Sequence, residues 1–469
     1  MYSIHFTGKS VGIRGSSRHS FLDNSRIAWL SVTFCLVFFF GFLENSTAEA
    51  SKSTDTRDRK VEALEHAVER LTREIEILKR EREAEEPIIE KQEEDVSEPK
   101  DQIGKMNRDN LFSESSWINR FNLGGYGEMH ANFTVGEDKD KFDIHRLVLY
   151  LGYDFNERIK FHSELEIEHA FVSDNSDGEF GLEQAYVDFL LREPFNVRFG
   201  RILTPLGIIN QRHEPPSFNG VERPSFEKYI IPSTWSSDGL GVFGTLAPGV
   251  KYEAYVVGGL DGSQFDSKNG IRGGRIKDRP SLSDPAVTAR LDFYPLVHHS
   301  PRYDQRLRLG VSGYLGGLDN GTGGSNPGID SDIQIYSGDF DYTIMDLDLR
   351  GVIAFEKIDG AQEIGNGTAS EIFGWYLEAG YHFFPDTLKK GLLEKADATL
   401  FVRYDDYDTQ YKMPSGIPEN PAGDRQEWTM GLSFHPIPNF VIKADYQIRE
   451  DGTDEDLDDL FNLGIGWQF

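Results

Sequence analysis

From about residue 119 to the C-terminus, apolar and polar residues alternate in a series of short segments. A period of two is typical of β-strands with one apolar face. In the segment from Ile159 to Phe171, Phe161 and Leu165 point to one side, and Lys160 points to the other. We count sixteen such segments, near residues 121, 143, 159, 183, 195, 239, 250, 286, 306, 332, 345, 373, 397, 426, 440 and 460. A soluble β-sandwich would show the same alternation, so both folds stay open at this point.

The connections between these segments alternate in length. Those after even-numbered segments are short, such as 154–158 and 436–439, whereas most of those after odd-numbered segments are long, such as 258–284 and 408–425. Outer-membrane barrels have an even number of strands, short periplasmic turns and longer external loops. We therefore predict an all-β fold, a transmembrane antiparallel β-barrel of about sixteen strands over residues 119–469. Residues 384–395 are long for a short turn, and a miscounted strand there is an open alternative.

Two further features favour a conducting barrel. The third long connection, about 201–237, is the longest, and in general porins the third loop folds inward and narrows the pore. Sixteen strands enclose a lumen too wide for side chains alone to fill.

The terminal alternation that ends at Trp467 and Phe469 resembles the signal by which outer-membrane barrels are recognised for insertion.

Residues 1–50 have the pattern of a signal peptide. Basic residues precede an apolar run from Ile27 to Leu43, and Ala48-Glu49-Ala50 offers a small-x-small cleavage site. A membrane anchor is the alternative. The only cysteine, Cys35, lies inside the run, so the mature chain would have neither disulfides nor thiol ligands.

Residues 51–86 are predicted to form a short α-helical coiled coil in the periplasm. The apolar residues have the three-four spacing of a heptad seam, at Val61, Leu64, Val68, Leu71, Ile75 and Leu78. A single amphipathic helix is the alternative. Pro87 ends the helix, and residues 87–118 are interpreted as an acidic linker.

The formal net charge of −29 disfavours nucleic acid as a partner, because phosphate binding needs clustered cations. A mean hydropathy of −0.47 is too polar for helical membrane spans, but it suits strands in which every second residue is apolar.

Residues 119–469 resemble the phosphate-selective porin O and P family. The resemblance is carried by an ordered set of segments, namely His145-Arg146-Leu147-Val148-Leu149, Glu183-Gln184-Ala185-Tyr186-Val187-Asp188, Gly200-Arg201-Ile202-Leu203-Thr204-Pro205-Leu206-Gly207, Asp238-Gly239-Leu240-Gly241-Val242, Ala289-Arg290-Leu291, Leu400-Phe401-Val402-Arg403-Tyr404-Asp405 and the terminal strand. It implies a sixteen-stranded trimeric pore for small solutes, often anions. This chain has Leu203 where the family commonly carries lysine, which weakens the expectation of phosphate selectivity.

The candidate site residues are cations expected to face the lumen. If the apolar strand faces contact lipid, the opposite faces place six arginines on the wall, namely Arg146, Arg198, Arg290, Arg308, Arg350 and Arg403. Four more lie in or beside the candidate constriction loop, namely Arg201, Arg212, Arg223 and Lys228. Such cations can pass an anion from site to site. Because carboxylates share the same face and the same loop, pairing between opposite charges is the alternative, and the net sign at the constriction is open. Our hypothesis is a mild anion preference.

We expect no catalytic residues, no cofactor and no metal site. The carboxylates of Glu164, Glu166 and Glu168 are spaced about 7 Å apart along a strand, too far to share one cation. We predict a homotrimeric porin of the bacterial outer membrane for small hydrophilic solutes or anions, in contact with outer-membrane lipid. A structural anchor barrel or an outer-membrane enzyme are the alternatives.

Overall fold

The computed structural model describes residues 118–136, 139–169, 178–276, 278–296, 305–453 and 457–469. The predicted signal peptide and coiled coil, and nearly all of the predicted linker, lie outside the described residues. These three assignments therefore stay predictions.

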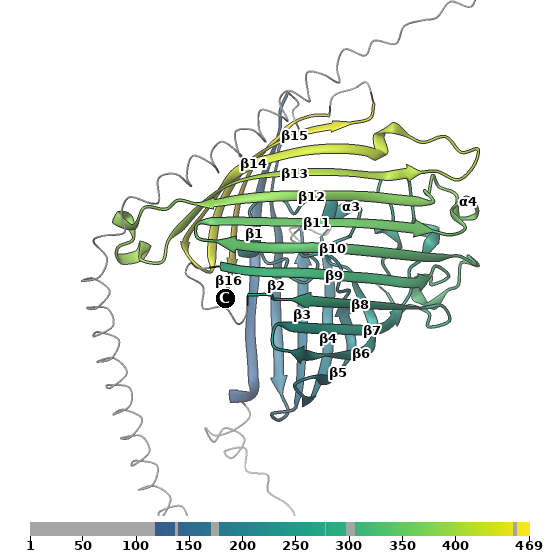
Figure 1. Ribbon diagram of the computed structural model, residues 1–469, viewed down its shortest axis with the longest axis horizontal. Coiled ribbons are helices and arrows are strands. Elements are labelled where there is room, and N and C mark those ends of the chain that lie inside the picture. Colours follow the sequence, from purple (N-terminus) through teal and green to yellow (C-terminus); the bar gives the residue numbers. More distant parts are fainter. Residues whose placement is uncertain (1–117, 137–138, 170–177, 277, 297–304, 454–456) are drawn as a thin grey trace, which may run out of the picture. The chain divides into compact units, whose positions relative to one another are not determined.

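Sixteen antiparallel strands form one closed barrel, in which each strand pairs with its neighbours in sequence and β1 pairs with β16 (Figure 1). The strands are β1 (Phe121–Thr134), β2 (Lys141–Asp154), β3 (Ile159–Glu168), β4 (Glu179–Arg192), β5 (Phe195–Leu203), β6 (Ser236–Ala247), β7 (Val250–Gly258), β8 (Pro285–Phe293), β9 (Gln305–Gly317), β10 (Asp332–Ile344), β11 (Leu347–Ile358), β12 (Glu371–His382), β13 (Asp397–Lys412), β14 (Asp424–Ile437), β15 (Phe440–Asp451) and β16 (Leu460–Gln468). Each of the sixteen expected positions falls in, or within two residues of, a different strand. The predicted fold class is confirmed for the barrel.

Only short helices occur in the described residues, and none of them has both the length and the apolar character needed to cross a membrane. They are η3 (Ile118–Arg120), η4 (Pro215–Ser217), α3 (Phe226–Tyr229), η5 (Gly262–Gln264), η6 (Arg272–Gly274), η7 (Thr322–Gly324), α4 (Ala361–Ile364), η8 (Asp386–Leu388), η9 (Gly391–Leu393) and η10 (Pro421–Gly423). Because η8 and η9 fill the connection between β12 and β13, no strand was missed there.

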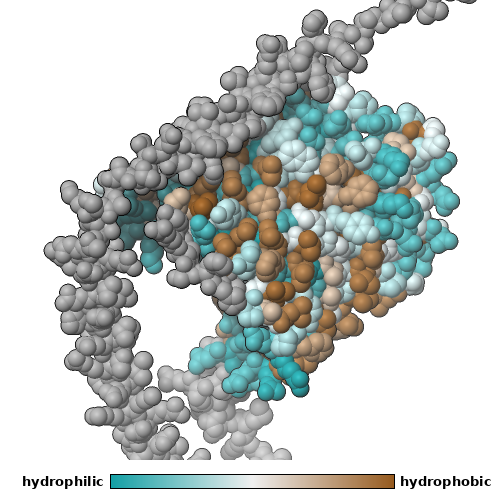
Figure 2. Space-filling model, in the orientation of Figure 1, coloured by the Kyte–Doolittle hydropathy of each residue, from teal (hydrophilic) through white to brown (hydrophobic). Residues whose placement is uncertain are grey.

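The strands turn their apolar side chains outward. In β8, Val287 and Leu291 are exposed, whereas Thr288 and Arg290 between them are buried on the inner face. Figure 2 shows hydrophobic side chains over the strands, with hydrophilic ones towards the long loops. A soluble sandwich would bury its apolar faces, so the outward apolar face together with the closed sheet rules out that alternative.

The main hydrophobic cluster lies inside the barrel, because two long connections fold into the lumen. We name them L3 (residues 204–235, between β5 and β6) and L4 (residues 259–284, between β7 and β8). Phe226 and Trp235 of L3 and Phe265 of L4 pack with Val352 and Tyr376 of the wall, and all five are buried. L3 thus folds inward as predicted. The inward fold of L4 was not expected.

Candidate pore constriction

The base of L3 is held closed by the buried side chain of Asn210. Its amide donates to the carbonyl oxygens of Thr204, at 2.7 Å, and Trp235, at 3.0 Å. Its Oδ1 accepts the backbone N–H of Trp235 at 2.8 Å. One asparagine therefore joins the two ends of the loop.

Carboxylates on the wall opposite β5 and β6 accept hydrogen bonds from L3. The N–H of Val221 donates to Asp445 at 2.6 Å, and the N–H of Phe226 donates to Asp405 at 3.1 Å. Both carboxylates are buried, on β15 and β13. L3 thus crosses the lumen and is fixed to the far wall.

Wall cations hold L3 through its carbonyl oxygens. Arg290 donates to the carbonyl of Gly207 at 2.9 Å, Arg350 to that of Ser217 at 3.2 Å, and Lys443 to that of Gly220 at 2.8 Å. These contacts satisfy loop carbonyls that would otherwise be buried without a partner. Inward-facing charges therefore serve to fix the position of the loop.

Glu227 is the most enclosed charged group of L3, with no exposed surface. Its carboxylate accepts the N–H groups of Ile208, at 3.1 Å, and Ile209, at 3.0 Å, and the hydroxyl of Tyr376, at 3.2 Å. Burial raises the pKa of Glu227 to about 7, although the hydrogen bonds oppose this rise. Within L3, Glu227 thus ties one end of the loop to its middle and to the wall.

His213 of L3 lies between two buried carboxylates. Its Nε2 is 3.4 Å from Glu164 of β3 and 3.6 Å from Glu183 of β4. Burial disfavours the imidazolium, but these two carboxylates outweigh burial and hold the pKa of His213 well above its ordinary value. Glu164 therefore interacts with His213, whereas Glu166 and Glu168 both pair with Arg146.

All six predicted wall arginines face inward, and each is paired with a carboxylate. Arg290 and Arg308 share Asp339, at 2.9 and 2.6 Å. The other pairs are Arg146 with Glu128 at 2.6 Å, Arg198 with Asp188 at 2.7 Å, Arg350 with Asp341 at 3.5 Å and Arg403 with Asp405 at 2.8 Å. The pairing alternative therefore describes these contacts. A role for the six arginines in conduction stays a prediction.

The four predicted cations of the loop region differ from one another. Arg201 lies at the end of β5 and pairs with Asp238 at 2.6 Å. Arg223 donates to the carbonyl oxygen of His213 at 3.3 Å. Arg212 and Lys228 are exposed, and they are the only exposed residues among the ten predicted cations.

Arg212 and Arg350 come together at one carboxylate. The guanidinium of Arg212 lies 4.0 Å from Asp341, to which Arg350 also approaches within 3.5 Å. The side chain of Arg212 is 50% exposed, against 21% for Arg350. Asp341 thus lies between two guanidinium groups, of which that of Arg212 is the more exposed.

L4 braces L3 from the side of the long loops. Arg275 donates to the carbonyl of Ser233 at 2.6 Å, and Arg272 donates to that of Lys228 at 3.3 Å. The hydroxyl of Thr409 on the far wall donates to the carbonyl of Ser267 at 2.7 Å. The apolar residues of this connection, among them Leu260, Phe265, Ile271 and Ile276, could have indicated the inward fold in the sequence.

Two cavities adjoin L3. One, of about 110 Å³, is lined by Ser217, Arg350 and His382, among others. The other, of about 250 Å³, is lined by Tyr150, Leu203 and His213, among others. Leu203 is buried, so the position where the resemblance leads one to expect lysine is apolar.

Comparisons with known proteins agree with this architecture. Residues 122–268 match the family described as phosphate-selective porin O and P. An uncharacterized protein of Aquifex aeolicus (strain VF5) is 33% identical over 365 residues, which are 74% of this chain and 79% of the relative.

Solved structures with weaker likeness include an anion-selective porin from Comamonas acidovorans, with 14% identity, a TM-score of 0.46, and coverage of 74% of this chain and 99% of that one. The outer membrane channel DcaP of Acinetobacter baumannii has 16% identity, a TM-score of 0.46, and coverage of 74% and 97%. The family assignment does not depend on these two likenesses.

Proposed function

We propose that this chain, which belongs to the phosphate-selective porin O and P family, is an outer-membrane porin in which L3 gives small hydrophilic solutes a route with a mild preference for anions. The family and the barrel indicate a channel rather than an enzyme. Passive diffusion past the inserted loop is the transport mechanism.

The observation that carries the anion preference is the exposure of charge on L3. The exposed charged residues of the loop are Arg212 and Lys228, whereas Glu214 and Glu222 are half-buried and Glu227 is buried. A few charges at the narrowest part of a pore control most of the field along it. A permeating ion therefore meets a positive loop surface.

Several inward charges of the wall pair over short distances, which weakens the field that they add along the pore. Asp339 bridges two guanidiniums, and Asp405 lies 2.8 Å from Arg403. Paired charges of opposite sign act as dipoles, whose field falls off faster with distance than that of a single charge. We therefore assign charge preference to L3 and not to the wall.

A phosphate-specific site is not part of the proposal. Leu203 is buried and apolar, and it cannot supply the cation that the resemblance leads one to expect at that position. The exposed loop cations attract anions in general, without the convergent donors that recognise phosphate. Chloride and other small anions should pass as readily as phosphate.

Reversal potentials in planar bilayers test this proposal. With a KCl gradient across the membrane, the wild-type channel should favour chloride, and Arg212→Ala combined with Lys228→Ala should shift the reversal potential towards that of potassium. Arg279→Ala is the matched control, because Arg279 is an exposed cation of L4 that is not part of L3. A cation preference in the wild type, or an equal shift in the control, would contradict the proposal.

Assembly as a homotrimer, with the coiled coil in the periplasm, is a further part of this proposal. It is supported by the family resemblance and by the heptad seam from Val61 to Leu78. Deletion of residues 61–78 should lower the fraction of trimer on native gels while leaving the barrel folded. A trimer fraction equal to that of the full chain would refute a role for the seam.

A further inference from the structure

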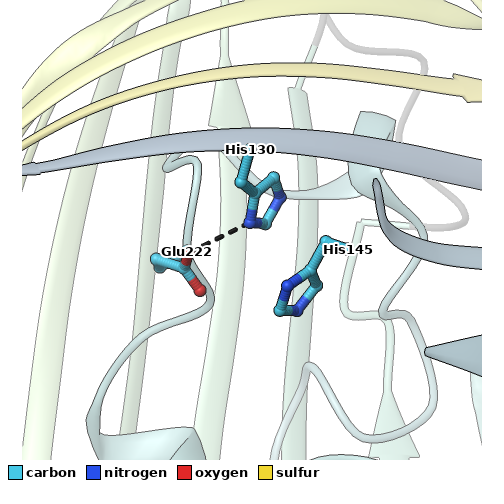
Figure 3. A group of neighbouring side chains, drawn as sticks. All are labelled: His130, His145 and Glu222. Atoms are coloured by element: carbon cyan, nitrogen blue, oxygen red, sulfur yellow. Dashed lines mark hydrogen bonds and ion pairs between the residues drawn. The ribbon is translucent and has the colours of Figure 1, made fainter. Parts of the chain in front are cut away.

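Two histidines of neighbouring strands and one carboxylate of L3 lie together in the lumen. His130 of β1, His145 of β2 and Glu222 point towards one another (Figure 3). One ligand atom from each lies within 4.8 Å of the others. His130 Nδ1 is 3.0 Å from Glu222 Oε1, and the two imidazole rings stack with their centroids 4.4 Å apart.

A second set of ligands continues this cluster. Asp143, His145 and His169 also bring one ligand atom each within 4.8 Å of the others. His169 Nδ1 is 2.7 Å from Asp143 Oδ2. Three histidines and two carboxylates thus form a continuous group, with His145 common to both sets.

The electrostatic surroundings favour a bound cation. Glu128 lies 3.2 Å from His130 Nε2 and provides a further carboxylate beside the cluster. The nearby cation Arg146 lies 3.1 Å from His145 Nε2, and it pairs with Glu128, Glu166 and Glu168. With neutral histidines, the carboxylates around this point outnumber that one guanidinium, so a cation gains electrostatic energy there.

The ligand types define the class of cation. Imidazole nitrogens suit zinc, copper and nickel, whereas magnesium and calcium favour oxygen ligands alone. A tetrahedral zinc ion with ligands at about 2.0–2.1 Å places its ligand atoms about 3.3 Å apart. Two ligand atoms 4.8 Å apart, the upper limit in this cluster, must therefore move closer to each other by roughly 1.5 Å to bind the same ion. The side chains of His145 and Glu222 are 21% and 36% exposed, which leaves them room to move.

We propose that His130, His145 and Glu222 bind one divalent transition-metal cation of the zinc class, with Asp143 and His169 at its outer edge. Binding displaces the hydrogen bond between His130 and Glu222 and releases its proton. Because Glu222 belongs to L3 and both histidines belong to the wall, the metal cross-links the loop to β1 and β2. This site does not depend on the charge preference proposed above.

Isothermal titration of the purified full-length protein, without a histidine tag, with Zn²⁺ tests the site. The wild type should bind about one zinc per chain, and MgCl₂ at the same concentration should give no binding. His130→Gln and His145→Gln should each weaken zinc binding at least about tenfold. The matched control is His162→Gln, because His162 is a part-buried histidine of β3 whose ring stacks on Tyr186 at 5.1 Å.

X-ray absorption at the zinc edge adds a readout that a merely structural effect would not change. The wild type should show two imidazole ligands, and His145→Gln should show one fewer. Glu222→Gln provides a variant outside the barrel strands, and it should also weaken binding. Channel activity without zinc, measured on the same samples, checks folding and tests the porin function separately. Undiminished zinc binding in both histidine variants, or an equal loss in His162→Gln, would overturn the proposal.

Discussion

Ionisation of Glu227 should loosen L3. This residue lies outside the membrane-spanning strands and has no exposed surface, and burial raises its pKa from 4.5 to about 7. In an undocked loop the carboxyl returns to its ordinary value, so the docked loop binds the proton more tightly. Docking is therefore strongest below about pH 4.5 and weakens as the pH rises to about 7. The pKa difference of 7 minus 4.5 corresponds to roughly 3 kcal/mol.

Hydrogen exchange at the amides of Ile208 and Ile209 measures this effect, because both amides donate to the Glu227 carboxylate. Between pH 5 and pH 7, the protection factor, after correction for intrinsic exchange, should fall roughly fortyfold, because the change approaches tenfold per unit of pH only between the two pKa values and flattens near each of them. The full chain in detergent is a suitable sample, with peptides from the strands as an internal reference.

Glu227→Gln distinguishes the ionisation of Glu227 from a general effect of pH on hydrogen exchange. The amide cannot ionise, so protection at Ile208 and Ile209 should become nearly independent of pH. Glu214→Gln is the matched control on the same loop, where Glu214 is half-buried and accepts the hydroxyl of Tyr150 at 3.2 Å. Glu214→Gln should keep the pH dependence of the wild type. Equal protection at pH 5 and pH 7 in the wild type, or the same slope in Glu227→Gln, would refute the argument.

Two substitutions test other contacts. Gly207 has φ +64°, and a β-carbon there would lie 2.8 Å from the Glu227 carboxylate. Gly207→Ala should therefore speed exchange of the two amides more than Gly365→Ala does, because Gly365 has φ +73° with open space around it. Asp339→Ala removes one of the two carboxylates that Arg290 and Arg308 share, the other being Asp292, so the cost should stay below about 3 kcal/mol. We expect a lower temperature for the heat-induced mobility shift on gels, and an unchanged temperature would contradict the assignment.

The strands could be predicted because lipid imposes a simple rule on them. Every second residue must be apolar, and each external loop must be followed by a strand that returns to the short-turn end. β3 and β8 follow this rule closely, and so does β16. Phe469 follows β16, and its backbone pairs with that of Gly125 to help close the barrel. Residues 384–395, where a miscounted strand was an open alternative, contain Leu388 and Leu392. These two residues are apolar, as in a strand, although they lie in 3-10 turns.

The site could be predicted only in part, because its contacts join distant parts of the chain. The length of L3 indicated its inward fold, but nothing local indicates that Val221 meets Asp445, 224 residues further on. The exposure of Arg212 and the burial of Glu227 follow from that docking. The histidine cluster likewise joins strand residues to Glu222, which is 92 residues from His130.

The charged residues of the inner wall and those of L3 have different roles, which the sequence alone does not separate. Arg290 and Lys443 donate to carbonyl oxygens of L3, and Asp405 and Asp445 accept its N–H groups. Changing such a residue therefore alters where the loop lies before it alters the field that an ion meets. Arg212 differs, because it is exposed and lies no closer than 4.0 Å to the carboxylate with which it pairs. In this barrel, wall charges should control conductance through the position of L3, and the exposed cations of L3 should control which ions pass.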